Sequence, residues 1–163
     1  MTFTQSNDET ITQAVKAFQS LDVDEQLGLF YFIYKEMGNS VTPAAPGAST
    51  VGTDIAEGLF NQIKDLSHEE QLQIQRDLIN KADTEYTRMY GSMSETTKLL
   101  VWYRLAQGMD DATIIPMPSD YKLSSQAEQV FNQIKGMEFQ QQITLFRDYV
   151  GPMGAEPKGG SEI

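Results

Sequence analysis

Apolar residues recur at every third or fourth position along most of this chain, from Glu9 to Val150, and this spacing limits the possible folds more than any other feature. The positions between them hold mainly Gln, Glu, Asp and Lys, and there is no alternation of Thr and Val. Such a spacing places apolar side chains on one face of an α-helix, whereas a half-buried strand needs a spacing of two. The sequence therefore predicts an all-α fold.

Residues that cap helices mark the ends of the expected segments. Short polar side chains accept hydrogen bonds from the free N–H groups of a first turn, and Gly or Pro often follows a last turn. The expected starts are at Asp8, at Asp22 or Asp24, at Ser67 with Glu70, at Ser94 and at Ser124. The expected stops are at Gly38, at Gly108 and at Gly151-Pro152. Residues 39–51 and 113–121 contain prolines and are expected to be loops, and residues 151–163 a frayed tail.

An internal repeat predicts how these helices are organised. The segment from Val15 to Leu29 has counterparts from Phe60 to Ile74 and from Phe131 to Leu145, and a partial fourth copy runs from Met93 to Tyr103. Each copy predicts a helix, a tight turn and a second helix. The copies are spaced too irregularly for an open solenoid, so we expect four hairpins that form two small bundles packed together.

Two of the copies carry aromatic residues along their second helix. The first has Leu27, Phe30, Tyr31 and Tyr34, and the fourth has Leu99, Trp102, Tyr103 and Ala106. The other two copies have Leu72, Gln75 and Arg76, and Ile143, Phe146 and Arg147, at the equivalent positions. The spacing places each aromatic set on one helix face, so the two faces could form the walls of a long apolar slot. An ordinary core is the alternative, and it is the commoner role for aromatic residues at helical spacing.

Composition excludes several classes of function. The net charge is −11, which disfavours binding to nucleic-acid phosphates or to an anionic membrane surface. There is no cysteine and only one histidine, so disulfides, thiol nucleophiles and sites with several His or Cys ligands are not expected, and no acid–base pair indicates an enzyme. The polar N-terminus and the lack of a long apolar run predict a cytoplasmic protein with no signal peptide and no transmembrane segment.

Four stretches of sequence together are specific enough to indicate a family. They run from Glu25 to Gly38, from Ala44 to Ala48, from Trp102 to Leu105 and from Pro116 to Ser124. In combination they resemble the N-terminal, carotenoid-binding domain of the cyanobacterial orange carotenoid protein. Because the chain stops after that domain, it also resembles the stand-alone helical carotenoid proteins.

The resemblance implies a domain of two interlocked four-helix bundles over residues 1–150, followed by a flexible tail. Such a domain holds a ketocarotenoid, canthaxanthin or echinenone, without a covalent bond, and protects against light by quenching singlet oxygen. The carotenoid-binding residues that match the family's tunnel are Leu27, Phe30, Tyr31, Tyr34, Leu99, Trp102, Tyr103, Ala106, Met117, Pro118 and Tyr121. Arg147 matches the arginine linked to docking on the antenna, and Asp24 matches an acidic residue near the pigment ring.

The chain departs from the family pattern at several positions. Tyr31 and Met93 stand where the family usually has tryptophan, and Gln75 stands where it usually has a methionine. The C-terminal domain that makes the family photoswitchable is absent from the sequence, so the resemblance predicts a holoprotein without light switching. The phycobilisome and a separate C-terminal-domain-like carotenoid carrier stay open as partners, and the periphery of the thylakoid membrane or of the phycobilisome stays open as a location within the cytoplasm. The competing hypothesis is a helical protein-interaction or carotenoid-carrier module with no quenching role.

Overall fold

The computed structural model describes residues 2–37 and 50–156. All regular secondary structure in these two ranges is helical, which confirms the predicted all-α fold. The helices are α1 (Thr2–Gln19), α2 (Val23–Met37), α3 (Thr50–Lys64), α4 (His68–Asn80), α5 (Glu85–Gly91), α6 (Glu95–Asp111), α7 (Ser125–Lys135) and α8 (Phe139–Val150).

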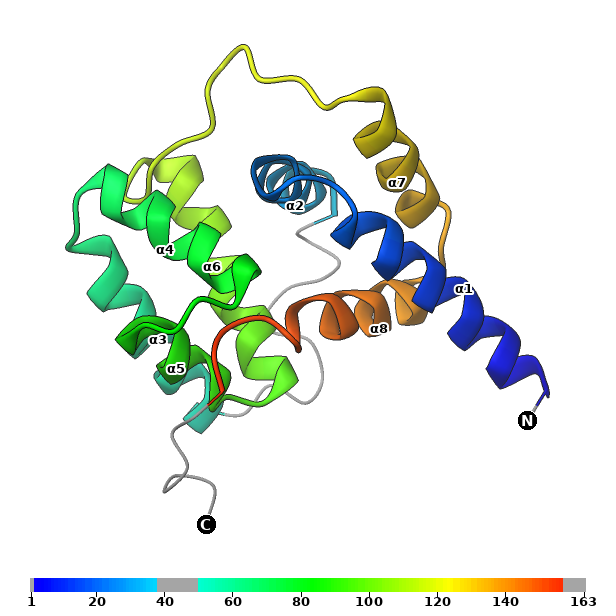
Figure 1. Ribbon diagram of the computed structural model, residues 1–163, viewed down its shortest axis with the longest axis horizontal. Helices are drawn as coiled ribbons and strands as arrows, with labels where there is room; N and C mark the ends of the chain where they lie inside the picture. Colours follow the sequence, from blue (N-terminus) through cyan, green and yellow to red (C-terminus); the bar gives the residue numbers. More distant parts are fainter. Residues whose placement is uncertain (1, 38–49, 157–163) are drawn as a thin grey trace.

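The helices pack as two bundles that the chain visits in turn (Figure 1). Helices α1, α2, α7 and α8 form the outer bundle, named for the outer parts of the sequence, and α3 to α6 form the middle bundle. The chain leaves the outer bundle after α2, completes the middle bundle, and returns through residues 112–124 to α7. Helix α6 packs on α8, and α2 packs on α4 and α6, so the bundles share an interface. This is the predicted pair of interlocked four-helix bundles.

The sequence copies correspond to the hairpins α1–α2, α3–α4 and α7–α8, with the partial copy at the turn between α5 and α6. Ser67, Ser94 and Ser124 each accept a hydrogen bond from the backbone N–H three residues on, and Ser67 with Glu70 forms a complete capping box. At the start of α2 the Oδ1 atom of Asp22 accepts from Glu25 N at 2.9 Å, so Asp22 is the cap. These predicted helix starts are confirmed.

Each full hairpin is closed by a buried glutamine at the same position of the repeat: Gln26, Gln71 and Gln142. The Nε2 atom of each donates to a backbone carbonyl at the end of the preceding helix or in the turn after it, for example from Gln26 to Leu21 O at 2.8 Å and from Gln142 to Ile134 O at 3.0 Å. In the partial copy Lys98 stands at this position and donates from Nζ to Gly151 O. Burial lowers the pKa of Lys98, and the charge of Glu95 opposes that shift. The repeat thus places a polar clamp at each of the three full hairpins, whereas Lys98 joins α6 to the residue that follows α8.

The predicted helix stop at Gly108 is wrong. Helix α6 continues through Gly108 to Asp111 and ends at Ala112, whose φ is 69°. Gly108 is buried, and a Cβ there would lie 2.4 Å from Cγ1 of Ile114. The N–H of Ile114 donates to the carbonyl of Gly108 at 3.1 Å. The glycine is therefore needed where the returning chain packs against α6, and not as a helix terminator.

Both ends of the described chain also differ from expectation. Helix α1 begins at Thr2, ahead of the expected start at Asp8, because extending an existing helix by one residue costs little once it has nucleated.

Helix α8 ends before Gly151 as predicted, but the prediction of a frayed tail is wrong for residues 151–156. Met153, Gly154 and Ala155 are buried, and Gly154 N and Ala155 N donate to Leu78 O and Thr87 O at 2.8 and 3.1 Å. Residues 157–163, Gly38 and most of the expected loop 39–51 lie outside the described residues.

Candidate functional site

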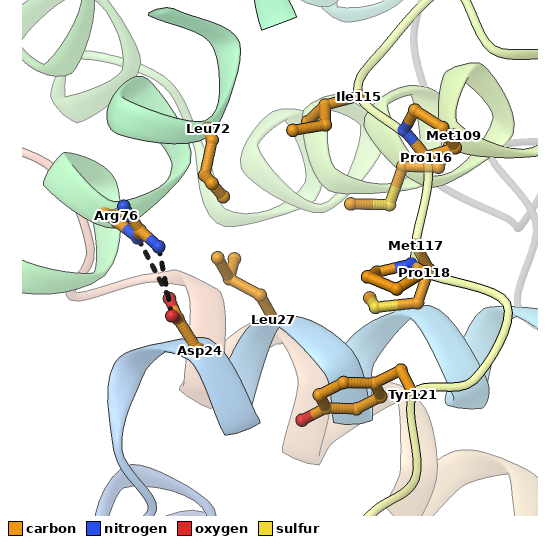
Figure 2. Close-up of a pocket in the computed structure, with 10 residues that line it drawn as sticks. All are labelled: Asp24, Leu27, Leu72, Arg76, Met109, Ile115, Pro116, Met117, Pro118 and Tyr121. Atoms are coloured by element: carbon orange, nitrogen blue, oxygen red, sulfur yellow. Dashed lines mark hydrogen bonds and ion pairs between the residues drawn. The ribbon is translucent and has the colours of Figure 1, made fainter. Parts of the chain in front are cut away.

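An apolar cavity of about 270 Å³ lies between α2, α4, α6 and the segment 112–124 (Figure 2). We call it the wide cavity. Its walls are apolar except at Asp24 and Arg76, whose partly exposed side chains lie at its edge. The residues that line it are Asp24, Leu27, Leu72, Arg76, Met109, Ile115, Pro116, Met117, Pro118 and Tyr121.

A narrow space of about 10 Å³, which we call the neck, adjoins the wide cavity. Leu27 and Met109 line both spaces, so the two are direct neighbours that share these side chains. The other residues that line the neck are Phe30, Tyr31, Gln75, Trp102, Leu105 and Ala106. Most of these are buried, so the neck leads from the wide cavity toward the centre of the molecule. We call the wide cavity and the neck together the apolar passage.

The walls come from equivalent positions of the repeat. Helix α2 contributes Leu27, Phe30 and Tyr31, and α4 contributes Leu72, Gln75 and Arg76 at the matching positions. Helix α6 contributes Trp102 and Ala106 from the same register. Residues spaced by three and four lie on one helix face, so three hairpin copies turn the same face toward the passage.

The indole of Trp102 is held by a chain of hydrogen bonds that reaches the other bundle. Its Nε1–H donates to Tyr90 Oη at 3.0 Å, and Tyr90 Oη–H donates to Val150 O at 2.8 Å. Burial raises the pKa of Tyr90 well above its ordinary value, so this hydroxyl keeps its proton. The ring of Trp102 lies 5.7 Å from that of Phe30. The aromatic wall of the neck is therefore fixed in orientation.

Tyr31 is held from its polar end. Its hydroxyl donates to Asp110 Oδ1 at 2.9 Å, and Lys35 forms an ion pair with the same carboxylate at 3.1 Å. Burial, with the hydrogen bond to Asp110, raises the pKa of Tyr31.

Tyr121 lies flat on α2 because the helix has a glycine there. A Cβ on Gly28 would lie 2.5 Å from the ring of Tyr121, so no other residue leaves room for it. The ring also stacks on Phe32, with centroids 6.1 Å apart. Burial raises the pKa of Tyr121, and the charges of Glu25, Asp22 and Asp24 add to the shift. This packing attaches the segment 112–124 to α2 and makes it one wall of the wide cavity.

The edge of the wide cavity carries the charged pair Asp24–Arg76. Arg76 donates from Nε and Nη2 to the two carboxylate oxygens of Asp24 at 2.9 and 3.0 Å, drawn as dashed lines in Figure 2. The pair joins α2 to α4, one helix from each bundle. Both side chains are more than one-third exposed, so solvent screens the attraction.

The structure brings together most of the residues predicted for the site. Leu27, Phe30, Tyr31, Trp102, Ala106, Met117, Pro118 and Tyr121 line one or both spaces of the passage. Three predicted residues, Tyr34, Leu99 and Tyr103, line neither. The rings of Tyr34 and Tyr103 contact each other edge-to-face, with centroids 5.3 Å apart. Burial raises the pKa of Tyr34, and the electrostatic effect of Tyr103 adds to the shift. Arg147 on α8 also lies outside the passage.

Several lining residues were not among those predicted. Leu72 and Arg76 occupy the repeat positions of Leu27 and Tyr31, so the repeat register could have identified them. Met109 and Leu105 lie on α6, and Ile115 and Pro116 come from the returning segment. Leu105 and Pro116 belong to the stretches that indicated the family, but no sequence signal placed any of these four residues in the site, because their place depends on how α6 and that segment pack.

Within the described ranges 2–37 and 50–156, no three His, Cys, Asp or Glu side chains are grouped so that they could hold a metal ion. Within the same ranges, none of the helices combines the length and the apolar character that crossing a membrane requires.

Comparison with known proteins gives one consistent family. The family model described as "Orange carotenoid protein, N-terminal" matches residues 4–156. An "Orange carotenoid-binding domain-containing protein" of a Nostoc species is 45% identical over 149 residues, which cover 91% of this chain and 86% of the relative. The "Orange carotenoid-binding protein" of a Synechocystis species is 38% identical over 146 residues. These cover 90% of this chain and 45% of that relative, so the chain spans about half of the longer protein.

Two solved structures have the same fold. The Anabaena (Nostoc) Red Carotenoid Protein binding canthaxanthin is 61% identical, with a TM-score of 0.79 over 90% of this chain and 99% of that one. The Anabaena (Nostoc) Orange Carotenoid Protein binding canthaxanthin is 36% identical, with a TM-score of 0.80 over 90% of this chain and 46% of that one.

Proposed function

The chain belongs to the family of the orange carotenoid protein N-terminal domain, and from this premise we propose that it binds a ketocarotenoid, canthaxanthin or echinenone, without a covalent bond. The observation that carries the proposal is the apolar passage, a cavity with a neck lined by aromatic and aliphatic side chains from both bundles. The canthaxanthin held by the Red Carotenoid Protein, at 61% identity, supports this ligand class.

The dimensions of the passage fit one end of such a ligand. A carotenoid is a stiff apolar rod about as long as a bilayer core is thick, roughly 30 Å. A drug-sized ligand fills about 300–1,000 Å³, so the wide cavity accommodates an end ring and not the whole rod. The polyene would continue through the neck between Phe30 and Trp102, and the neck must widen to admit it. Tyr34 and Tyr103, further along α2 and α6, would lie beside the rod beyond the neck.

Photoprotection is the role that follows from this ligand. The bound polyene supplies the quenching of singlet oxygen, and the protein binds and orients it. Two aromatic rings provide flat surfaces of set orientation. Tyr90 fixes the indole of Trp102, and Asp110 fixes the hydroxyl of Tyr31. Such rings add dispersion contacts along the polyene.

Reconstitution with canthaxanthin tests the proposal. We expect a coloured complex whose visible band lies to the red of the free pigment and which quenches singlet oxygen. Ala106→Leu adds bulk inside the neck and should reduce pigment uptake at least tenfold. Ala127→Leu is the matched control, since Ala127 is equally buried but lies on α7 away from the passage. A colourless wild-type protein, or equal pigment loss in both variants, would contradict binding in the passage.

Quenching of a phycobilisome antenna is a further part of the proposal, and it depends on Arg147. This residue is half-buried on α8, and its Nε has no hydrogen-bond partner in the part of the chain that the structure describes. A guanidinium with a free donor can bind a carboxylate on a partner. Arg147→Glu should abolish antenna quenching and leave singlet-oxygen quenching unchanged. Equal loss of both would show that Arg147 supports the fold.

Illumination of the wild-type holoprotein with blue light checks the prediction that its absorption does not switch.

A further inference from the structure

Gln75 is a buried polar residue without a hydrogen-bond partner. Its exposed fraction is 0%, and it lines the neck of the apolar passage. Neither its Nε2 nor its Oε1 has a partner among the described residues. A buried amide with both ends unsatisfied has lost its hydrogen bonds to water and gained none in return, so such groups are rare in folded proteins and each calls for an explanation.

The repeat shows how unusual this residue is at its position. The equivalent residues of the other three copies are Phe30, Trp102 and Phe146, all aromatic and buried. The rings of Trp102 and Phe146 lie 5.7 and 6.2 Å from that of Phe30, so these positions meet at the centre of the molecule. Gln75 places an amide at the position where every other copy places a ring.

No other group that lines the neck bonds this amide in the described part of the chain. The two other polar side chains there are engaged elsewhere: Tyr31 donates to Asp110, and Trp102 donates to Tyr90. A water molecule is a poor occupant, because the volume of about 10 Å³ is at the lower limit for one water. A buried water also needs two to four polar partners, and the rest of the lining is apolar.

We propose that Gln75 is a specificity-determining residue of the carotenoid site: its amide hydrogen-bonds an oxygen atom on the end ring of the ligand and so favours oxygenated carotenoids over hydrocarbon ones. The proposal rests on the proposed function. Gln75 lines the neck, so an end ring seated where the wide cavity meets the neck would have its keto-bearing carbon, two ring carbons from the polyene, on the side of Gln75. A ring hydroxyl lies across the ring from the polyene and would reach Gln75 when the ring itself enters the neck. A keto oxygen accepts a hydrogen bond from Nε2–H, and a hydroxyl group can in addition donate to Oε1.

Competition between pigments tests this inference. The folded protein is offered equal amounts of canthaxanthin and β-carotene, and in a second arm of zeaxanthin and β-carotene, and the bound pigments are extracted and counted. Gln75→Met keeps the length of the side chain and removes the amide. A hydrogen bond contributes about 0.5–1.5 kcal/mol, so the preference for the oxygenated pigment should fall about threefold to tenfold in at least one arm. The arm that responds tells whether a keto or a hydroxyl oxygen is recognised.

Gln73→Met is the matched control. Gln73 lies on the same helix, is exposed and bonds only locally to Asp77, so the same substitution there should leave the preference unchanged. A second readout is the carbonyl stretching band of bound canthaxanthin, which should move to higher frequency in Gln75→Met if the keto arm responds. An unchanged preference in both arms would overturn the role of Gln75. Failure of the wild type to bind any of the three pigments would overturn the proposed function instead.

Discussion

Two glutamines one turn apart on α4 show how differently the two levels of the hairpin repeat are built. Gln71 is buried and fully bonded: its Nε2 lies 3.1–3.3 Å from four backbone carbonyls, and its Oε1 accepts from Ile115 N at 2.8 Å. Gln75 is equally buried and has no hydrogen bond in the described chain. Both lie on the same helix face, since they are four residues apart.

The difference separates positions that hold the fold from positions that line the passage. The clamp level of the repeat closes the three full hairpins through backbone carbonyls, with Gln26, Gln71 and Gln142. Lys98, at the same position of the partial copy, bonds Gly151 after α8 instead. The next level, with Phe30, Gln75, Trp102 and Phe146, faces the centre of the molecule, and three of these four residues line the passage or its neck. A polar side chain therefore stabilises the fold at the clamp level. At the level that faces the passage it destabilises the fold unless a ligand forms hydrogen bonds with it.

Breaking the clamp level should have the largest effect. Gln71→Ala removes the amide and leaves Ile115 N and several carbonyls without their partner, so we expect a loss of about 3 kcal/mol in the free energy of unfolding. Urea unfolding of the ligand-free protein measures this. The exposed Gln73→Ala should stay within about 0.5 kcal/mol of wild type. A similarly small change for Gln71→Ala would show that the clamp does not hold the hairpin.

High pH should destabilise the fold through two buried tyrosine hydroxyls, one of which bonds a clamp glutamine. Burial raises the pKa of Tyr90 and Tyr149 well above the ordinary value of 10.0, so both stay neutral when folded. Unfolding lets them ionise, and the stability present below pH 10 is therefore lost as the pH rises above it, by about 1.4 kcal/mol per pH unit for each tyrosine. Tyr149, which donates to Gln26 at 2.7 Å, is the residue to replace. Unfolding between pH 9 and 11 should depend less steeply on pH in Tyr149→Phe, and an unchanged slope would be evidence against this origin.

Replacing Gln75, the unbonded glutamine, should raise the free energy of unfolding, whereas replacing Gln71 lowers it. Gln75→Met removes an unsatisfied amide from an apolar wall at nearly constant volume, so the ligand-free protein should gain about 1 kcal/mol. Thermal and urea unfolding without pigment measure this gain. A loss of more than about 1 kcal/mol would mean that Gln75 takes part in the fold as Gln71 does.

The ion pair at the edge of the wide cavity should contribute least to the free energy of unfolding. Asp24→Asn breaks the ion pair with Arg76, but both side chains are partly exposed, so the change in stability should stay below about 1 kcal/mol and shrink further in high salt. Urea unfolding at low and high salt checks it. A larger, salt-independent loss would show that the pair fixes α2 against α4.

Sequence reasoning predicted the helices, the hairpins and the aromatic faces of α2 and α6 for reasons that are local, whereas Met117, Pro118 and Tyr121 came only from the family resemblance. A cap such as Ser67 and its partner Glu70 lie three residues apart, and the face of α2 that carries Leu27, Phe30 and Tyr31 follows from helical spacing alone. Gly108 shows where local reasoning fails. It looks like a helix stop, yet its role depends on Ile114, which packs on it only after the chain has turned back.

The sequence by itself thus determined the fold class, the hairpin repeat and the faces that α2 and α6 bury, because each depends on residues within about two turns of one another. Only the tertiary structure decided which of two buried glutamines is satisfied. It also decided that Asp24 meets Arg76 and that Tyr149 meets Gln26, pairs separated by 52 and 123 residues. Such contacts depend on how the two bundles pack, and helical periodicity carries no information about which distant face an element will meet.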